Sequence, residues 1–274
     1  MPDLDAIRRA VDLIRDADSL VIMAGAGMGV DSGLPDFRGN QGFWKAYPAL
    51  GRKSLGFRDM ANPDAFIENP QLAWGFYGHR LQLYRDTVPH DGFRILRALG
   101  GMKPHWIFAY TSNVDGQFQK AGFAESDVAE CHGSIHHLQC SQPCSSAIWP
   151  ADELSIDIDM ETCQLRSPLP NCPHCGDLAR PNILMFYDWT WLSDRVDLQE
   201  EQYQNWAIEA HDPVVIEIGA GTDLPTIRRK GERLAAPIIR INPTNADVNG
   251  SKDVGLGMGA LDALRQIGEQ MGVA

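Results

Sequence analysis

The stretch that decides the fold is Val21-Ile22-Met23-Ala24-Gly25-Ala26-Gly27-Met28-Gly29-Val30-Asp31-Ser32-Gly33-Leu34-Pro35-Asp36-Phe37-Arg38-Gly39. Its apolar start predicts a buried strand. Three glycines at alternate positions follow, and such a turn lets backbone N–H groups approach a phosphate. The glycines alone are a weak signal, because Val30 occupies the third glycine position of the usual dinucleotide fingerprint. The segment 34–39 combines an acid, an aromatic ring and a base, and this combination makes the stretch far more distinctive than its glycines alone.

Three further apolar runs, at residues 106–111, 213–219 and 237–242, each end in glycine or polar residues. Stretches with helical character separate them, and residues 4–17 carry apolar side chains at helical spacing. Strands that alternate with helices predict an α/β protein with a parallel sheet. Ligands of such sheets bind at the carboxyl ends of the strands.

The composition describes an ordinary globular protein, with 274 residues, 44% of them hydrophobic. The length suits one large domain or a domain with a substantial insertion. A formal net charge of −12 argues against a nucleic-acid partner, which usually meets a basic surface. Neither a membrane span nor a signal peptide is apparent, so we expect a cytoplasmic location and no membrane association. The oligomeric state stays open.

The regular apolar pattern disappears between residues 132 and 180, where two closely spaced cysteine pairs occur. These are Cys140, Cys144, Cys172 and Cys175. Two such pairs can bring four thiolates into the tetrahedron of a structural zinc site. We therefore expect one structural Zn²⁺, with buried free thiols as the alternative. Because four cysteines close the site, we expect His174 to face solvent and Cys163 not to be a ligand.

Taken in order along the chain, several motifs resemble those of the sirtuins, which are NAD-dependent protein deacylases. The glycine stretch matches the family signature through Phe37-Arg38. Further matches follow in the family's order: Asn113-Val114-Asp115-Gly116, Glu130-Cys131-His132-Gly133-Ser134, the two cysteine pairs, Arg180-Pro181 and Ile241-Asn242. The resemblance spans residues 4–265, which is nearly the whole chain.

The resemblance implies a fold class and a division of the chain. The fold would be α/β, with a Rossmann-like parallel-sheet domain and a smaller domain made of a zinc-ribbon module and a helical insertion. The expected NAD-binding domain comprises residues 1–39, 104–131 and 181–274. The helical insertion would be 40–103, and the zinc-binding module 132–180. NAD and structural Zn²⁺ are the implied cofactors, and acylated-lysine proteins the implied partners.

The resemblance also assigns roles to polar side chains at strand ends. His132 would be the general base, a task that a near-neutral pKa suits. Asn113 and Asp115 would hold the nicotinamide and the ribose side of the cofactor; an ordinary strand-end turn is the alternative for both. Phe37, in a loop over the cofactor with Asp36, would shield the reactive carbon.

Other residues would bind the cofactor, with plain turns as the alternative. The expected cofactor-binding set is Gly25, Ala26, Gly27, Asp36, Phe37, Arg38, Ser112, Asn113, Asp115, Gly219, Ala220, Gly221, Asn242, Pro243, Met258 and Gly259. Three departures from the family pattern lie at positions expected near the cofactor. Ser112 replaces a glutamine, while Gly29 and Gly221 each remove a hydroxyl group.

Tyr77 and Arg80 reproduce a Tyr-x-x-Arg pair with which one sirtuin class binds acidic acyl chains. Residues one helical turn apart share a face, and arginine can bind a carboxylate with two N–H groups. The alternative is an ordinary helix with Tyr77 in the core and Arg80 in a surface salt bridge. Phe186 is a further expected substrate residue, in a segment Phe186-Tyr187-Asp188 where the family has Phe-Gly-Glu.

The function implied is an NAD-dependent protein-lysine deacylase that transfers the acyl group to ADP-ribose and releases nicotinamide. Deacetylation, and desuccinylation or demalonylation through Tyr77 and Arg80, are the expected activities. A protein ADP-ribosyltransferase or NAD hydrolase is the first alternative, which Ser112 keeps open. A non-catalytic nucleotide-sensing module is the second. The combination of His132, Asn113, Asp115 and Arg38 argues against it.

Overall fold

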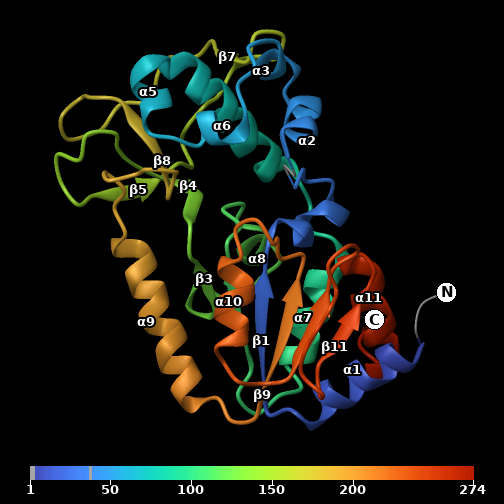
Figure 1. Cartoon of the computed structure of the whole chain (residues 1–274). Coiled ribbons are helices and arrows are strands. Elements are labelled where there is room, and N and C mark those ends of the chain that lie inside the picture. Colours follow the sequence, from blue (N-terminus) through green and yellow to red (C-terminus); the bar gives the residue numbers. More distant parts are fainter. Residues whose placement is uncertain (1–3, 37–38) are drawn as a thin grey trace.

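The computed structural model describes residues 4–36 and 39–274, and the side chains of all of these except 39–41. A parallel sheet of six strands, in the order β11-β10-β9-β1-β2-β3, forms the larger part (Figure 1). Its strands are β1 (Ser19–Ala24), β2 (Ile107–Thr111), β3 (Val128–Glu130), β9 (Pro213–Ile218), β10 (Ile238–Ile241) and β11 (Val254–Leu256). The predicted α/β class with a parallel sheet is confirmed. Strand β11 was not predicted, because its three residues are too few to give a clear apolar run.

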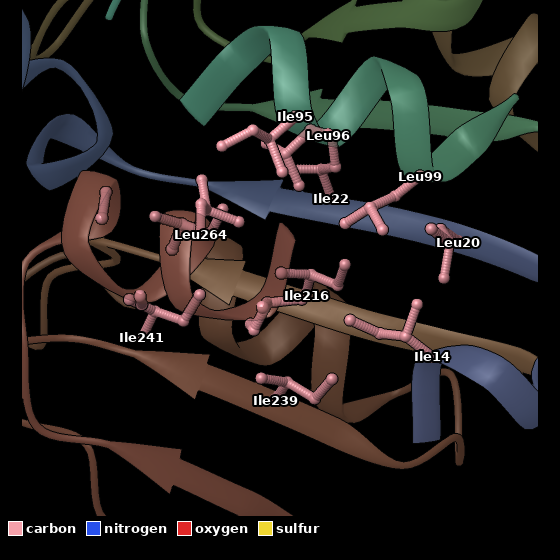
Figure 2. Close-up of a cluster of buried hydrophobic side chains, with 14 of the residues drawn as sticks. Ile14, Leu20, Ile22, Ile95, Leu96, Leu99, Ile216, Ile239, Ile241 and Leu264 are labelled. Atoms are coloured by element: carbon pink, nitrogen blue, oxygen red, sulfur yellow. The ribbon is translucent and has the colours of Figure 1, made fainter. Parts of the chain in front are cut away.

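Helices cover both faces of this sheet. On one face lie α1 (Leu4–Asp16), α7 (Asp91–Gly100) and α11 (Ala260–Met271); on the other lie α9 (Asp194–Glu209) and α10 (Thr226–Glu232). Figure 2 shows the core beneath α1, α7 and α11, in which Ile22 of β1 lies near Leu96 and Leu20 of β1 lies near Leu99. Val21 and Met23 belong to the core on the other face. Because both faces are buried, β1 is apolar throughout and does not alternate.

The smaller part lies beyond the carboxyl ends of the sheet strands (Figure 1). It holds a three-stranded antiparallel sheet in the order β5-β4-β8 and a hairpin of β6 and β7. Its strands are β4 (Gly133–Cys140), β5 (Ile148–Pro150), β6 (Ile158–Asp159), β7 (Gln164–Leu165) and β8 (Ala179–Ile183). Its helices are α2 (Gly39–Ala46), α3 (Pro48–Arg52), α4 (Phe57–Met60), α5 (Asp64–Glu68) and α6 (Pro70–Asp86).

One aromatic-rich core joins these helices to the antiparallel sheet. Phe76 and Tyr77 of α6 are buried in it, together with Leu138 of β4 and Ile183 of β8. At Gly75 the helix lies so close to the β6–β7 hairpin that a Cβ would meet the Cys163 carbonyl oxygen at 2.0 Å. The helical insertion and the cysteine-containing segment therefore pack as one unit.

Helix α7 falls inside the range 40–103 expected for the insertion, yet it packs on the parallel sheet with α11. We propose that the insertion proper ends with α6, at Asp86. Three short elements complete the chain: η1 (Ala26–Ser32), α8 (Gln117–Lys120) and η2 (Glu125–Asp127). In the part of the chain that the structure describes, no helix has the length and apolarity to cross a membrane.

Candidate functional site

A cavity of about 860 Å³ lies between the parallel sheet and the smaller part. Gly25, Asn113 and His132 line it from the ends of β1, β2 and β3, and Tyr77 and Met185 line it from the opposite side. This volume falls within the usual range for pockets that bind small molecules and cofactors. The site lies at the edge of the sheet that the parallel topology predicts.

The glycine turn after β1 packs directly on the turn after β9. A Cβ on Gly27 would lie 2.6 Å from the Gly219 Cα, and Gly219 adopts a φ of +60°. The Gly25 N–H donates to the Ile218 carbonyl (2.9 Å), and the Gly27 N–H donates to the Gly219 carbonyl (3.1 Å). Gly25 and Gly27 are thus required because the two turns approach so closely. Their N–H groups donate to carbonyl groups of the protein and are not available to a phosphate.

The turn after β2 is fixed to the end of β1. The Thr111 hydroxyl donates to the Ala24 carbonyl (3.0 Å) and accepts from the Asn113 N–H (3.0 Å). The Asn113 side-chain amide donates to the Gly25 carbonyl (3.1 Å). Asn113 is therefore held in place by backbone groups of the glycine turn, and Ser112 beside it also lines the cavity.

Asp115 is a buried carboxyl group at the cavity wall, 8% exposed. Its Oδ1 accepts from the Gln117 N–H at 3.0 Å. Burial raises the Asp115 pKa to about 6, although this hydrogen bond and the nearby Arg80 charge act in the opposite direction. His136 supports the same turn, because its Nε2 lies 3.0 Å from the Asp115 carbonyl oxygen.

His132 stands where the chain leaves the parallel sheet. Gly133 has a φ of +79°, and a Cβ there would lie 2.1 Å from the Asn182 carbonyl oxygen, so only glycine fits. This turn directs β4 into the smaller part and leaves the His132 imidazole at the cavity. Burial lowers the pKa of His132, while a hydrogen bond to the Ser112 carbonyl acts the other way. Burial thus favours the neutral imidazole, which is the form that can accept a proton.

Glu130, two residues before His132, ties β3 to α9. Its Oε2 accepts from the Arg195 Nη2 at 2.6 Å, and its N–H donates to the Gln199 Oε1 at 3.0 Å. Burial raises the Glu130 pKa to about 7 in spite of the Arg195 charge. The glutamate of the Glu130-Cys131-His132 motif therefore anchors to α9 the end of the strand that precedes the histidine.

Tyr77 and Arg80 both line the cavity from α6. Tyr77 stacks on Phe66, with ring centroids 5.4 Å apart. Arg80 is 7% exposed, and its Nη2 donates to the Tyr84 hydroxyl at 2.8 Å. The alternative of a surface salt bridge is wrong for Arg80, because the guanidinium is buried beside the cavity.

The cavity brings together many, but not all, of the expected site residues. Those that line it are Gly25, Ala26, Asp36, Tyr77, Arg80, Ser112, Asn113, Asp115, His132, Phe186 and Gly221. Those outside its lining are Gly27, Gly219, Ala220, Asn242, Pro243, Met258 and Gly259. Phe37 and Arg38 lie outside the described residues. The cavity thus includes the residues expected at the nicotinamide and the substrate, but not the expected cofactor-binding residues that follow β10 and β11.

Asn242 shows why a motif residue can lie away from the cavity. Its Nδ2 donates to the Ala220 carbonyl (3.1 Å), and its Oδ1 accepts from the N–H groups of Thr244 and Asn245. The side chain is 1% exposed and joins the loops after β9 and β10. Asn245, which this turn positions, lines the cavity instead.

Two groups of lining residues were not predicted from the sequence. One lies around α4 and includes Phe57, Arg58 and Asp59. The other precedes and begins α10, and consists of Thr222, Asp223, Leu224, Thr226 and Ile227. Arg58 lies over the Phe186 ring, 4.8 Å from its centroid. Neither segment carries a recognisable motif. The only sequence signal for the second group is that it follows the Gly219 turn at a predicted strand end. The first group has no signal beyond lying in the predicted insertion.

The four predicted cysteines form a cluster whose sulfur atoms all lie within 4.8 Å of one another. The Sγ atoms of Cys140 and Cys175 are 3.7 Å apart, as are those of Cys144 and Cys172. A tetrahedral ion with Zn–S bonds of about 2.3 Å requires sulfur separations of about 3.8 Å. The donor set and its spacing fit one structural Zn²⁺. His174 is exposed, and Cys163 is buried elsewhere, as predicted.

Comparison with known proteins gives a consistent assignment. The Sir2 family profile matches residues 25–216. An NAD-dependent protein deacylase of Aquifex aeolicus is 28% identical over 244 residues, covering 86% of this chain and 88% of the relative. NAD-dependent protein deacylase 1 of Pseudomonas aeruginosa is 34% identical over 182 residues, covering 66% of each chain.

The fold has solved counterparts as well. A structure described as a Sir2 homolog–NAD complex superposes with a TM-score of 0.70, at 22% identity, over 97% of this chain and 95% of the other. The family profile covers well over half of the sequence, and its range includes the glycine turn, Asn113, His132 and the four cysteines. The chain therefore belongs to the Sir2 family.

Proposed function

We propose that this protein is an NAD-dependent protein-lysine deacylase, which transfers an acyl group to ADP-ribose and releases nicotinamide. The observation that carries the proposal is that His132, Asn113 and Asp115 line one cavity at the strand ends of a Sir2-family chain. Relatives named NAD-dependent protein deacylase cover most of the chain. The substrates would be proteins that carry acylated lysines.

Bound NAD would supply the ribose carbon that accepts the acyl oxygen as nicotinamide leaves. The cavity offers Asn113 and Asp115 beside the glycine turn as the groups that orient the nicotinamide end. Gly221 leaves open space at the wall, since a Cβ there would meet nothing within 4 Å. The residues present thus leave room for part of a nucleotide along this wall.

His132 is suited to accept a proton. A neutral imidazole carries a lone pair on one ring nitrogen, which can act as a base. Burial lowers the pKa of His132 and so favours this neutral form. We assign to His132 the removal of a proton from a ribose hydroxyl, which makes that oxygen the nucleophile for acyl transfer.

The acyl group would lie against Tyr77 and Arg80. A buried guanidinium favours an acyl chain that ends in a carboxylate, because it can pair with that group in a site shielded from water. Arg80 already bonds to the Tyr84 hydroxyl and is oriented by it. We therefore propose that succinyl- or malonyl-lysine is preferred over acetyl-lysine.

The zinc ion that Cys140, Cys144, Cys172 and Cys175 would hold has no part in this chemistry. Four thiolates leave no open coordination position. Its role would be to join the turn after β4 to the turn before β8.

The test follows three products in one reaction. Purified protein is incubated with NAD and a peptide that carries acetyl-, succinyl- or malonyl-lysine, and mass spectrometry measures nicotinamide, deacylated peptide and labelled protein. Deacylation that tracks nicotinamide release is expected, and His132→Ala should abolish it. Nicotinamide release with labelled protein and no deacylated peptide would favour ADP-ribosyl transfer. Release with neither product would favour NAD hydrolysis.

A further inference from the structure

Two large aromatic side chains stand in solvent beside the mouth of the cavity. The Tyr187 side chain is 78% exposed and that of Trp189 is 94% exposed. They follow Leu184, Met185 and Phe186, all of which line the cavity. The exposed pair is thus continuous with the wall of the proposed active site.

The backbone conformation of Tyr187 is unfavourable for its side chain. Its φ is +58°, in the left-handed region that suits glycine and that bulky residues rarely adopt. A tyrosine could be justified there by packing, yet its side chain is mostly in water. The internal contacts of this chain therefore do not account for an aromatic residue at that position.

Between the two rings, Asp188 fixes the segment rigidly. Its side chain is fully buried and accepts from the Arg180 Nη2 at 2.8 Å. It also accepts from the N–H groups of Met185 (3.3 Å) and Thr190 (3.2 Å). Tyr187 and Trp189 thus project from an anchored turn, so little conformational entropy would be lost when they bind a partner.

We propose that Tyr187 and Trp189 form a platform that selects substrate peptides with an arginine or lysine near the acyl-lysine. The inference rests on the proposed function, since it assumes that the acyl-lysine enters the adjoining cavity. A cation is favoured because the exposed faces of tyrosine and tryptophan attract it, and because the chain carries a net charge of −12. The neighbouring Phe186 already carries the Arg58 guanidinium on its ring.

The test uses acyl-lysine peptides in which arginine, leucine or glutamate replaces serine at each position within four residues of the lysine. Two quantities are measured: kcat/KM with NAD, and affinity by fluorescence polarisation without NAD. At one or two positions, arginine should improve both by about three- to tenfold over serine, and leucine should not. In the variant Tyr187→Gly/Trp189→Ala this ratio should fall to near one.

Stability and a matched control separate recognition from folding. Glycine suits the φ of residue 187, so the double variant should melt no lower than the unmodified protein. Ile208→Ala removes an equally exposed side chain (78%) from α9 and should leave the arginine preference intact. An arginine preference that survives in the double variant, an equal gain from leucine, or a clear loss of stability would each overturn the inference.

Failure of the proposed function has a different signature. A protein that deacylates no peptide would contradict that function, and the binding measurement would still test the platform. Peptide affinity without any dependence on flanking charge would refute the platform while leaving deacylation in place.

Discussion

The buried ion pair between Arg180 and Asp188 makes a strong prediction about stability. The two side chains are 1% and 0% exposed, and Asp188 accepts four hydrogen bonds: from Arg180, Met185, and both the N–H and the hydroxyl of Thr190. In Asp188→Asn one oxygen becomes an NH₂ group, which must face a donor in either orientation. The variant therefore leaves Arg180 with an uncompensated buried charge, and its NH₂ group opposes either the Met185 N–H or the three donors that Oδ1 accepts in the aspartate.

Removing one partner of a buried pair costs about 3–5 kcal/mol. For a protein of this size, each kcal/mol lowers the melting temperature by about 2–4 °C, so Asp188→Asn should melt roughly 6–20 °C lower. Thermal unfolding followed by intrinsic fluorescence measures this shift. The matched control is Asp12→Asn, because Asp12 pairs with Arg15 at 3.6 Å on the surface, with exposures of 59% and 54%. That change should cost less than about 1 kcal/mol.

A second substitution tests whether the cost is electrostatic. Arg180→Met in the Asp188→Asn background removes the orphaned charge and should recover part of the lost stability. The reasoning is refuted if Asp188→Asn melts like Asp12→Asn, or if Arg180→Met simply adds its own loss to that of Asp188→Asn.

Four further predictions address the site and its supports. About one equivalent of zinc should copurify; Cys172→Ala should lose it and Cys163→Ala should keep it, as measured by mass spectrometry of the metal. Since burial lowers the His132 pKa and raises that of Asp115 to about 6, the acid limb of kcat/KM should be centred at or below about pH 6; a midpoint above 6.5 would contradict this. Arg80→Met should reduce desuccinylation by at least about tenfold more than deacetylation, because a charged pair is lost only with the acidic acyl group; equal losses on both peptides would make Arg80 structural. Gly27→Ala should lower the melting temperature by several degrees, since overpacking costs about 1–3 kcal/mol, whereas Gly257→Ala, with open space at its Cβ, should be neutral.

The part of the site that could be predicted consists of motifs in which a few neighbouring residues determine the local structure. A strand that ends in Asn113-Val114-Asp115, and a histidine followed by a glycine, indicate side chains at a sheet edge before any contact is known. The cysteine pairs indicate a metal site in the same way, because short spacing already brings two thiolates together. For these residues the sequence was sufficient, and the four-sulfur cluster has the predicted members.

The structure corrects the role that the sequence suggested for Gly25 and Gly27. Gly25 and Gly27 were expected to bring N–H groups to a phosphate, but they allow the turns after β1 and β9 to touch. Residues 25 and 219 are far apart in the sequence, so no local pattern could reveal that contact. The cavity residues around α4 escaped prediction for the same reason.

By itself, the sequence determined the α/β class, the family, the four cysteines that cluster and the strand ends that line the cavity. These properties depend on local periodicity, spacing and motifs, which the chain encodes over a few residues. Only the tertiary structure decided which polar groups are buried together. Glu217 lies in an apolar strand and is fully buried, yet it pairs with Arg240 through two bonds of 2.8 Å, because β9 and β10 are neighbours in register. Likewise, burial of Arg80 beside the cavity depends on the packing of α6, since a side chain's solvent exposure is set by the segments that cover it.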